Sequence, residues 1–176
     1  MRIFYFNMTG KGSHLLLPFR KMSTEALLRA TLHNGALLND VAAGSRYAAL
    51  YFSAGWCPDC VRFAPKLKKL AVAVPSLPII LVSSDRDASG LKKQLTTLRP
   101  AADIEAFGFD DPLRDDLKRR FGACAGSEQR SVGVAPRISG VPTLLLIKWP
   151  PVDGDKGQRI SEKQMMNAAW QKSIAT

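Results

Sequence analysis

Two cysteines separated by two residues are the part of this sequence best suited to chemistry. Cys57 and Cys60 lie in the segment Trp56-Cys57-Pro58-Asp59-Cys60, and the third cysteine of the 176-residue chain, Cys124, stands apart from them. A C-x-x-C pair can form and open a disulfide, or it can supply two thiolate ligands to a metal ion. The surrounding sequence favours the first use.

The elements on either side of the pair place Cys57 at the beginning of a helix. The apolar, aromatic run Tyr47–Phe52 predicts a buried strand that ends at Ser53-Ala54-Gly55, and apolar residues recur at helical spacing from Asp59 to about Ala73. Unpaired backbone N–H groups and the positive end of the helix dipole stabilise a thiolate at such a position. We therefore expect Cys57 to attack a disulfide, and Cys60, one turn further and less exposed, to resolve the mixed disulfide.

Two other uses of the pair are disfavoured by ligand count and by loop length. Structural zinc normally has four ligands, and the chain offers only Cys124, His14 and His33 besides the pair, with no second paired motif. A purely structural disulfide across so short a loop gives limited entropic stabilisation. We predict a redox-active disulfide between Cys57 and Cys60, with no metal and no bound organic cofactor.

The segment Gly140-Val141-Pro142-Thr143 supplies a second half of the site. It precedes the buried strand predicted for Thr143–Ile147. A cis bond before Pro142 would leave the backbone of Val141 free to pair with an extended substrate chain beside Cys57. The alternative is a trans proline that begins a strand, where proline is tolerated.

The remaining patterns predict an α/β fold in which helices flank a central sheet. A buried strand at Pro78–Val82 follows the helix after Cys60, which makes the two strands parallel with a right-handed crossover. Further helices are expected at Thr24–Leu38 (interrupted near Asn34-Gly35), at Ala88–Leu98 as an exposed helix, from Asp111-Pro112 to Gly122, and from the capping box Ser161–Gln164 to about Ile174.

Length and charge limit the domain organisation and the partners. We expect a basic N-terminal extension at 1–22 and one domain at 23–176, with a loop insertion at about 123–138. The formal net charge is +10, but the basic residues are spread along the chain and no nucleic-acid module is visible. No apolar run approaches the ~20 residues of a membrane span. We predict neither a nucleic-acid nor a membrane partner.

The cysteine content is typical of a reducing compartment, since one C-x-x-C and a single further thiol do not make a disulfide framework. We expect a cytoplasmic protein. The first 24 residues contain Arg and Lys but no Asp or Glu, a composition shared by organellar transit peptides, so a mitochondrial location is the alternative.

These motifs resemble the thioredoxin superfamily, and within it the tryparedoxin and nucleoredoxin-like group. The matching pieces span about Tyr47 to Ile147: Tyr51–Pro58, Pro65 five residues after Cys60, Val82-Ser83-Ser84-Asp85, Asp110–Leu113 with Phe121-Gly122, and Gly140–Thr143. The resemblance implies a thioredoxin-like fold with a central mixed β-sheet.

The resemblance also implies roles for site residues and partners. Cys57 would be the nucleophile, Cys60 the resolving thiol, Pro142 the cis-proline facing them, and Trp56 the aromatic wall of the site. The activity implied is thiol–disulfide oxidoreduction on protein disulfides, peroxidases among them, with trypanothione or glutathione as donor. A redox-regulated protein-binding module of nucleoredoxin-like type is the alternative.

Two features depart from the group. Asp59 stands where a second proline is usual, and we hypothesise that its carboxylate opposes ionisation of Cys57 and shifts the couple toward the reducing side. Cys124 lies in the insertion after Gly122, either as an inert small residue or as an accessory thiol near the active-site face.

Overall fold

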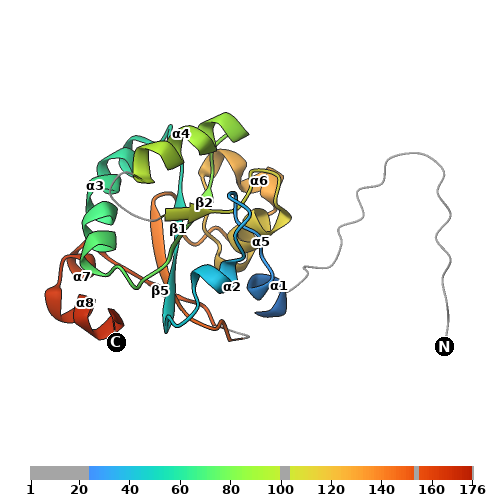
Figure 1. The fold of residues 1–176 in the computed structure, drawn as a ribbon. Helices are drawn as coiled ribbons and strands as arrows, with labels where there is room; N and C mark the ends of the chain where they lie inside the picture. The colour runs from blue at the N-terminus through green and yellow to red at the C-terminus, as the bar shows by residue number, and fades with distance from the viewer. Residues whose placement is uncertain (1–23, 100–103, 153–154, 176) are drawn as a thin grey trace, which may run out of the picture.

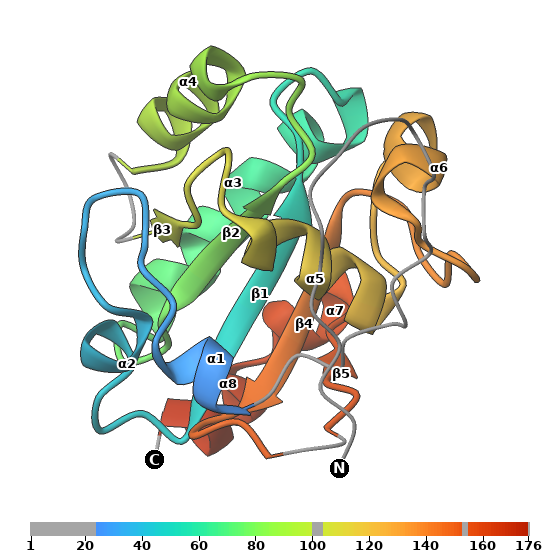
Figure 2. The ribbon, with the colours of Figure 1, turned by 90° about the vertical axis from the view of Figure 1, so that its right-hand side faces the viewer.

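A mixed β-sheet forms the centre of the computed structural model, which describes residues 24–99, 104–152 and 155–175 (Figures 1 and 2). Its strands within these ranges are β1 (Tyr47–Ser53), β2 (Ile79–Ser83), β3 (Ile104–Ala106), β4 (Thr143–Lys148) and β5 (Gln158–Arg159), in the spatial order β3-β2-β1-β4-β5. Strands β1, β2 and β3 are parallel, whereas β4 is antiparallel to both β1 and β5. The predicted α/β fold with a central mixed sheet is confirmed.

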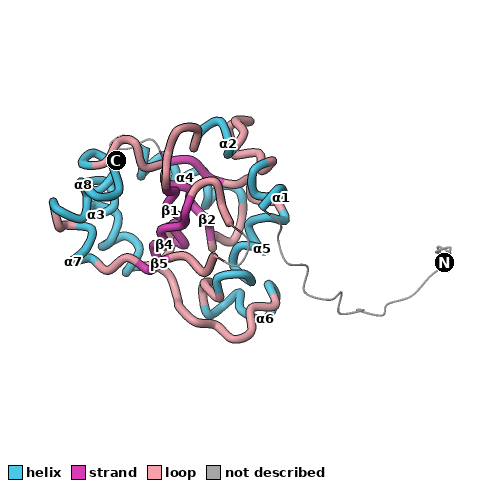
Figure 3. The backbone as a smooth tube through the Cα atoms, turned by 90° about the horizontal axis from the view of Figure 1, so that it is seen from below, coloured by secondary structure: helices cyan, strands magenta, loops and turns pink. Residues whose placement is uncertain are grey.

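Helices cover both faces of this sheet (Figure 3). They are α1 (Thr24–Leu28), α2 (Leu38–Val41), α3 (Pro58–Ala73), α4 (Ala88–Leu98), α5 (Pro112–Phe121), the 3₁₀ turn η2 (Gly126–Glu128), α6 (Gln129–Val132), α7 (Glu162–Met165) and α8 (Ala168–Ala175). No helix in the described ranges is long and apolar enough to cross a membrane.

Alternating side chains of β1 build two separate cores, as expected for a sheet buried on both faces. Tyr51 points into a core that it shares with Leu67 of α3 and Leu95 of α4. Its neighbour Phe52 points into the opposite core, with Leu117 of α5 and helices α1 and α2. Packing on both faces therefore fixes the orientation of β1 at the point where the chain continues to the cysteine pair.

Several predicted helix ends are confirmed by their capping contacts. The Asp111 carboxylate accepts a hydrogen bond from the N–H of Leu113 (2.9 Å), and Gly122 closes α5 at a φ of +59°. The capping box of Ser161 and Gln164 begins α7. Helix α4 has the predicted bounds, but it is not simply exposed, because its face with Leu91, Leu95 and Leu98 is buried.

Two predicted helices differ from the structure in extent. The helix expected over Thr24–Leu38 ends as α1 at Leu28, whereas the predicted interruption near Asn34-Gly35 is present as a turn in which the Asn34 side-chain oxygen accepts from the N–H of Ala36 (3.0 Å). The C-terminal helix is interrupted between α7 and α8 because the Asn167 side chain caps a new helix through the N–H of Trp170 (2.9 Å).

Other differences lie in short elements. The segment 123–138, expected to be a loop, contains η2 and α6. Strands β3 and β5 were not predicted, since three and two residues are too short to carry a periodic pattern. The predicted extension at 1–22 lies outside the described residues.

Candidate active site

Cys57 is the N-cap of α3, directly after the turn that follows β1. Its sulfur accepts a hydrogen bond from the N–H of Cys60 (Sγ···N 3.4 Å), and its thiol lies 3.8 Å from the carbonyl oxygen of Val141. An anionic sulfur here faces the unpaired N–H groups and the positive end of a four-turn helix. The predicted position of Cys57 at the start of a helix is confirmed.

Cys60 lies one turn into α3 and is 3% exposed, against 7% for Cys57. Burial raises the pKa of the Cys60 thiol to about 12, a hydrogen bond with Ser53 lowers it, and the nearby Cys57 raises it further. The hydroxyl of Ser53 also accepts a hydrogen bond from the Gln94 amide (2.8 Å). Ser53 and Gln94 therefore form a polar contact behind Cys60 that sequence analysis did not identify.

The loop before β4 lies against Cys57, as the thiol contact with Val141 shows. The peptide bond between Val141 and Pro142 is cis, which confirms the first of the two alternatives for this proline. Val141 is partly buried against Ala54, Cys57 and Cys60. Pairing of the Val141 backbone with a substrate chain stays a prediction.

Trp56 forms an exposed wall beside the pair. Its indole N–H donates to the carbonyl oxygen of Ser84 (3.1 Å), and the guanidinium of Arg86 lies 5.6 Å from the ring centroid. The residue keeps 43% of its surface exposed. Pro58 occupies the first turn of α3, where proline is tolerated because its missing N–H has no helical partner.

The Asp85 carboxylate binds the turn between β1 and α3, directly before Cys57. Its carboxylate accepts from the N–H of Gly55 (2.8 Å) and from the hydroxyl of Ser83 (2.7 Å). The signal for this contact was available, because polar residues directly follow two buried parallel strands, and such strand ends meet at one edge of a sheet. Sequence analysis placed Asp85 at the end of a strand without assigning it to the site.

An ion pair between Lys118 of α5 and Glu128 of η2 supports Ser84, the residue before Asp85. The ammonium of Lys118, fully buried, lies 2.7 Å from the Glu128 carboxylate, which also accepts from the hydroxyl of Ser84 and from the N–H of Ala125. The carbonyl oxygen of Ser84 in turn accepts the hydrogen bond from the Trp56 indole. No sequence motif connects Lys118 with Glu128, which lie on separate elements, so this ion pair was not predicted.

The two departures from the expected pattern, Asp59 and Cys124, lie in opposite environments. Asp59 is exposed on α3 and pairs with Arg62, so its charge faces solvent. Cys124 is fully buried in a small cluster with Val132 and Val134. Burial raises the pKa of the Cys124 thiol, and the Glu128 carboxylate raises it further. The environment of Cys124 is that of an inert side chain.

Known proteins resemble this chain in sequence and in fold. A family model described as thioredoxin-like matches residues 44–151. Human nucleoredoxin is 28% identical over 134 residues, which is 74% of this chain and 26% of nucleoredoxin. The chain thus spans about a quarter of the length of the nucleoredoxins it matches.

Two solved structures extend the comparison. A thioredoxin from Wuchereria bancrofti superposes with a TM-score of 0.54 at 25% identity, covering 85% of this chain and 88% of that one. Tryparedoxin II from C. fasciculata gives 0.52 at 22% identity, covering 77% and 78% respectively. The resemblance to nucleoredoxins in sequence and to tryparedoxins in fold is confirmed. With a C-x-x-C pair at the start of a helix and a family model covering most of the domain, this chain belongs to the thioredoxin-like family.

Proposed function

We propose that this protein is a thiol–disulfide oxidoreductase that reduces protein disulfides through Cys57 and Cys60. The observation that carries the proposal is the placement of the Cys57 sulfur. It caps α3, accepts the N–H of Cys60, and lies beside the Val141 carbonyl in the loop before β4. An attacking thiolate needs both a stabilised negative charge and an adjacent site for the substrate.

The proposed cycle transfers two electrons from a thiol donor to the substrate disulfide, and Cys57 and Cys60 are the only groups of the protein that change their covalent bonds. The Cys57 thiolate attacks one sulfur of the substrate disulfide, forms a mixed disulfide and releases the first substrate thiolate. Cys60, once deprotonated, attacks the Cys57 sulfur, forms the Cys57–Cys60 disulfide and releases the second substrate thiolate. A dithiol, or two thiols, then reduces that disulfide and is itself oxidised.

Partners follow from the family relationship. We propose protein disulfides as substrates, peroxidases among them, and a low-molecular-weight thiol such as trypanothione or glutathione as donor. The cysteine chemistry itself requires no metal and no bound organic cofactor.

The proposal is tested by reduction of insulin disulfides with each donor in turn and with dithiothreitol. We expect catalytic turnover by the unaltered chain and by Cys124→Ser, and loss of turnover in Cys57→Ser. Lack of turnover with every donor, in a chain that folds normally, would instead favour a redox-regulated binding module. That alternative predicts partner affinity that changes on oxidation without turnover.

A further inference from the structure

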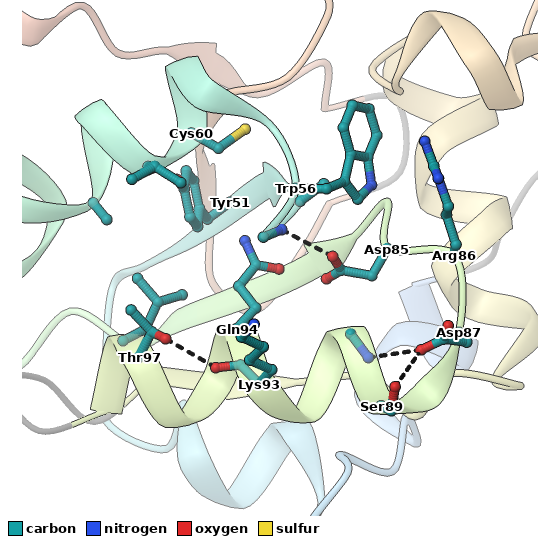
Figure 4. A pocket seen from close by; sticks show the side chains of 16 residues that line it. Tyr51, Trp56, Cys60, Asp85, Arg86, Asp87, Ser89, Lys93, Gln94 and Thr97 are labelled. Carbon is teal, nitrogen blue, oxygen red and sulfur yellow. Dashed lines mark hydrogen bonds between the residues drawn. The ribbon is translucent and has the colours of Figure 1, made fainter.

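A cavity of about 410 Å³ opens between α3 and α4, on the Cys60 side of the cysteine pair (Figure 4). Tyr51 of β1 contributes to its wall, and Cys60 lines it, whereas Cys57 does not. Cys57 instead faces the Val141 carbonyl. The volume falls within the ~300–1,000 Å³ range of small-molecule sites. The two sulfurs therefore face different surfaces: the Cys60 sulfur faces the cavity, and the Cys57 sulfur faces the loop before β4.

The apolar part of the cavity extends to the molecular surface. Trp56 and Val61 line it and are 43% and 60% exposed. Ala64 and Leu98 line it further. This lining favours a ligand with a flat or chain-like apolar body.

Two buried polar groups in the lining, on Gln94 and Tyr51, retain unused hydrogen-bonding capacity. Gln94 is 7% exposed, and its amide nitrogen donates to Ser53 while its oxygen has no hydrogen-bond partner among the described residues. Whichever way the amide is turned, only one end can meet Ser53. The fully buried hydroxyl of Tyr51 has Ser53 as its polar neighbour, and Ser53 already accepts a hydrogen bond from Gln94. Figure 4 shows the Gln94 amide rising from α4 toward Tyr51.

Buried polar groups without a full set of hydrogen-bond partners are uncommon in native proteins. A ligand that carries an amide or a hydroxyl can both donate and accept hydrogen bonds. Such a group next to Gln94 and Tyr51 would satisfy them.

The lining carries two carboxylates and two cationic side chains, so its formal charge is zero, but only the cations are left without a local hydrogen-bond partner in the described part of the chain. Asp85 accepts from Gly55 and Ser83, and Asp87 caps α4 through the N–H of Gly90 (2.7 Å), so both carboxylates are engaged in local hydrogen bonds. Arg86 and Lys93 pair with no carboxylate of the described residues. The net charge of +10 also attracts anions to the protein as a whole.

We propose that this cavity binds a small amphipathic organic anion. Its apolar body lies between Trp56 and α4, its amide or hydroxyl contacts Gln94 and Tyr51, and its anionic group contacts Arg86 or Lys93. A bound ligand covers Cys60 and leaves the face of Cys57 next to Val141 open. The site is thus distinct from the substrate face of the proposed reaction and does not depend on it.

The test uses two fluorescent probes that share one aromatic body. The anion 8-anilino-1-naphthalenesulfonate carries an N–H and a sulfonate, whereas N-phenyl-1-naphthylamine lacks the sulfonate. We expect the anion to bind at least about fivefold more tightly. Equal affinities would overturn the anionic assignment.

Variants locate the probe in the cavity. Ala64→Phe, which fills the space, should abolish saturable binding, and Lys93→Gln should weaken it about threefold, as expected for one exposed ionic contact. Lys92→Gln, the matched control one residue away on α4, should leave affinity within about twofold. Unchanged binding in both Ala64→Phe and Lys93→Gln would overturn the proposal.

A second readout reports contact with Cys60. In Cys57→Ser/Cys124→Ser, Cys60 is the only thiol, and a saturating amount of the anionic probe should slow its alkylation by iodoacetamide at least about fivefold. An unaltered alkylation rate at saturation would place the probe elsewhere and contradict the proposal.

Discussion

All three cysteines of this chain are free and buried, yet the surroundings of the Cys57–Cys60 pair and of Cys124 differ in almost every other respect. Cys57 receives a backbone N–H at the start of α3, and a cavity reaches Cys60. Cys124 lies in a closed cluster near the Glu128 carboxylate, which opposes its ionisation. Burial alone therefore does not distinguish the two environments. They differ in the helix N-terminus at Cys57 and in the cavity that reaches Cys60.

The two regions are nevertheless joined. Glu128, from the segment that carries Cys124, binds the Ser84 hydroxyl, and the Ser84 carbonyl holds the Trp56 indole. We infer that the segment 123–138 supports the wall of the site mechanically, while its own thiol takes no part in the reaction.

The largest difference between the regions should appear in cysteine variants. Cys60→Ser should lower insulin turnover on the order of a thousandfold, because the mixed disulfide at Cys57 is no longer resolved. Mass spectrometry should find that mixed disulfide accumulating on Cys57. Cys124→Ser should keep turnover within about twofold, and a loss of tenfold or more in that variant would make Cys124 an accessory thiol.

Removing Lys118 should be the most damaging change in the Cys124 region. Lys118→Met leaves the partly buried Glu128 carboxylate without its counter-ion, which should lower the free energy of unfolding by about 3 kcal/mol. Chemical denaturation measures it, with the exposed Lys172→Met as control. The double variant Lys118→Met/Glu128→Gln should regain part of the loss, and a single variant as stable as the parent would show that the pair is not a structural support.

Resolution by Cys60 should depend steeply on pH. Because burial raises the pKa of Cys60 to about 12, its thiolate is scarce at neutral pH and its population grows about tenfold per pH unit. The rate of resolution should rise accordingly between about pH 7 and pH 10, measured by release of nitrothiobenzoate from Cys57 in Cys124→Ser.

The same rate measurement tests the hydrogen bond between Ser53 and Cys60. Its hydrogen bond lowers the pKa of Cys60, so Ser53→Ala should raise that pKa and slow resolution severalfold at each pH. A resolution rate that levels off below about pH 9 would contradict the effect of burial on the pKa of Cys60. Equal resolution rates in Cys124→Ser with and without Ser53→Ala would show that Ser53 does not affect Cys60.

The smallest effect is expected at Asp59. Its exposed carboxylate pairs with Arg62, and solvent screens its charge. Asp59→Asn should change the rate of Cys57 alkylation less than about twofold, with the exposed Asp40→Asn as control. An increase above about fivefold would support the hypothesis that Asp59 restrains ionisation of Cys57.

Local patterns in the sequence predicted what neighbouring residues decide. A strand that runs into Cys57, the caps at Asp111 and Gly122, and the capping box at Ser161 all depend on contacts within a few residues. The cis bond before Pro142 was one of two alternatives that only the structure could decide.

Contacts between separate elements escaped prediction for the same reason, although the ends of two parallel strands gave a signal for the contact between Asp85 and Gly55. The Lys118–Glu128 pair, the hydrogen bond of Asp85 to Gly55, and the cavity beside Cys60 arise where separate elements pack together. The interruption near Asn34 was predicted, but the end of α1 at Leu28 was not. The break at Asn167 was missed because it depends on one side chain capping the backbone, which helix propensity alone does not reveal.

The most direct test of the redox account is an equilibrium titration of the full chain in mixtures of reduced and oxidised dithiothreitol, followed by alkylation and peptide mapping. The account predicts one two-electron transition in which Cys57 and Cys60 become a disulfide while Cys124 stays a thiol throughout. A pair that remains reduced at every ratio, or a disulfide that includes Cys124, would contradict it.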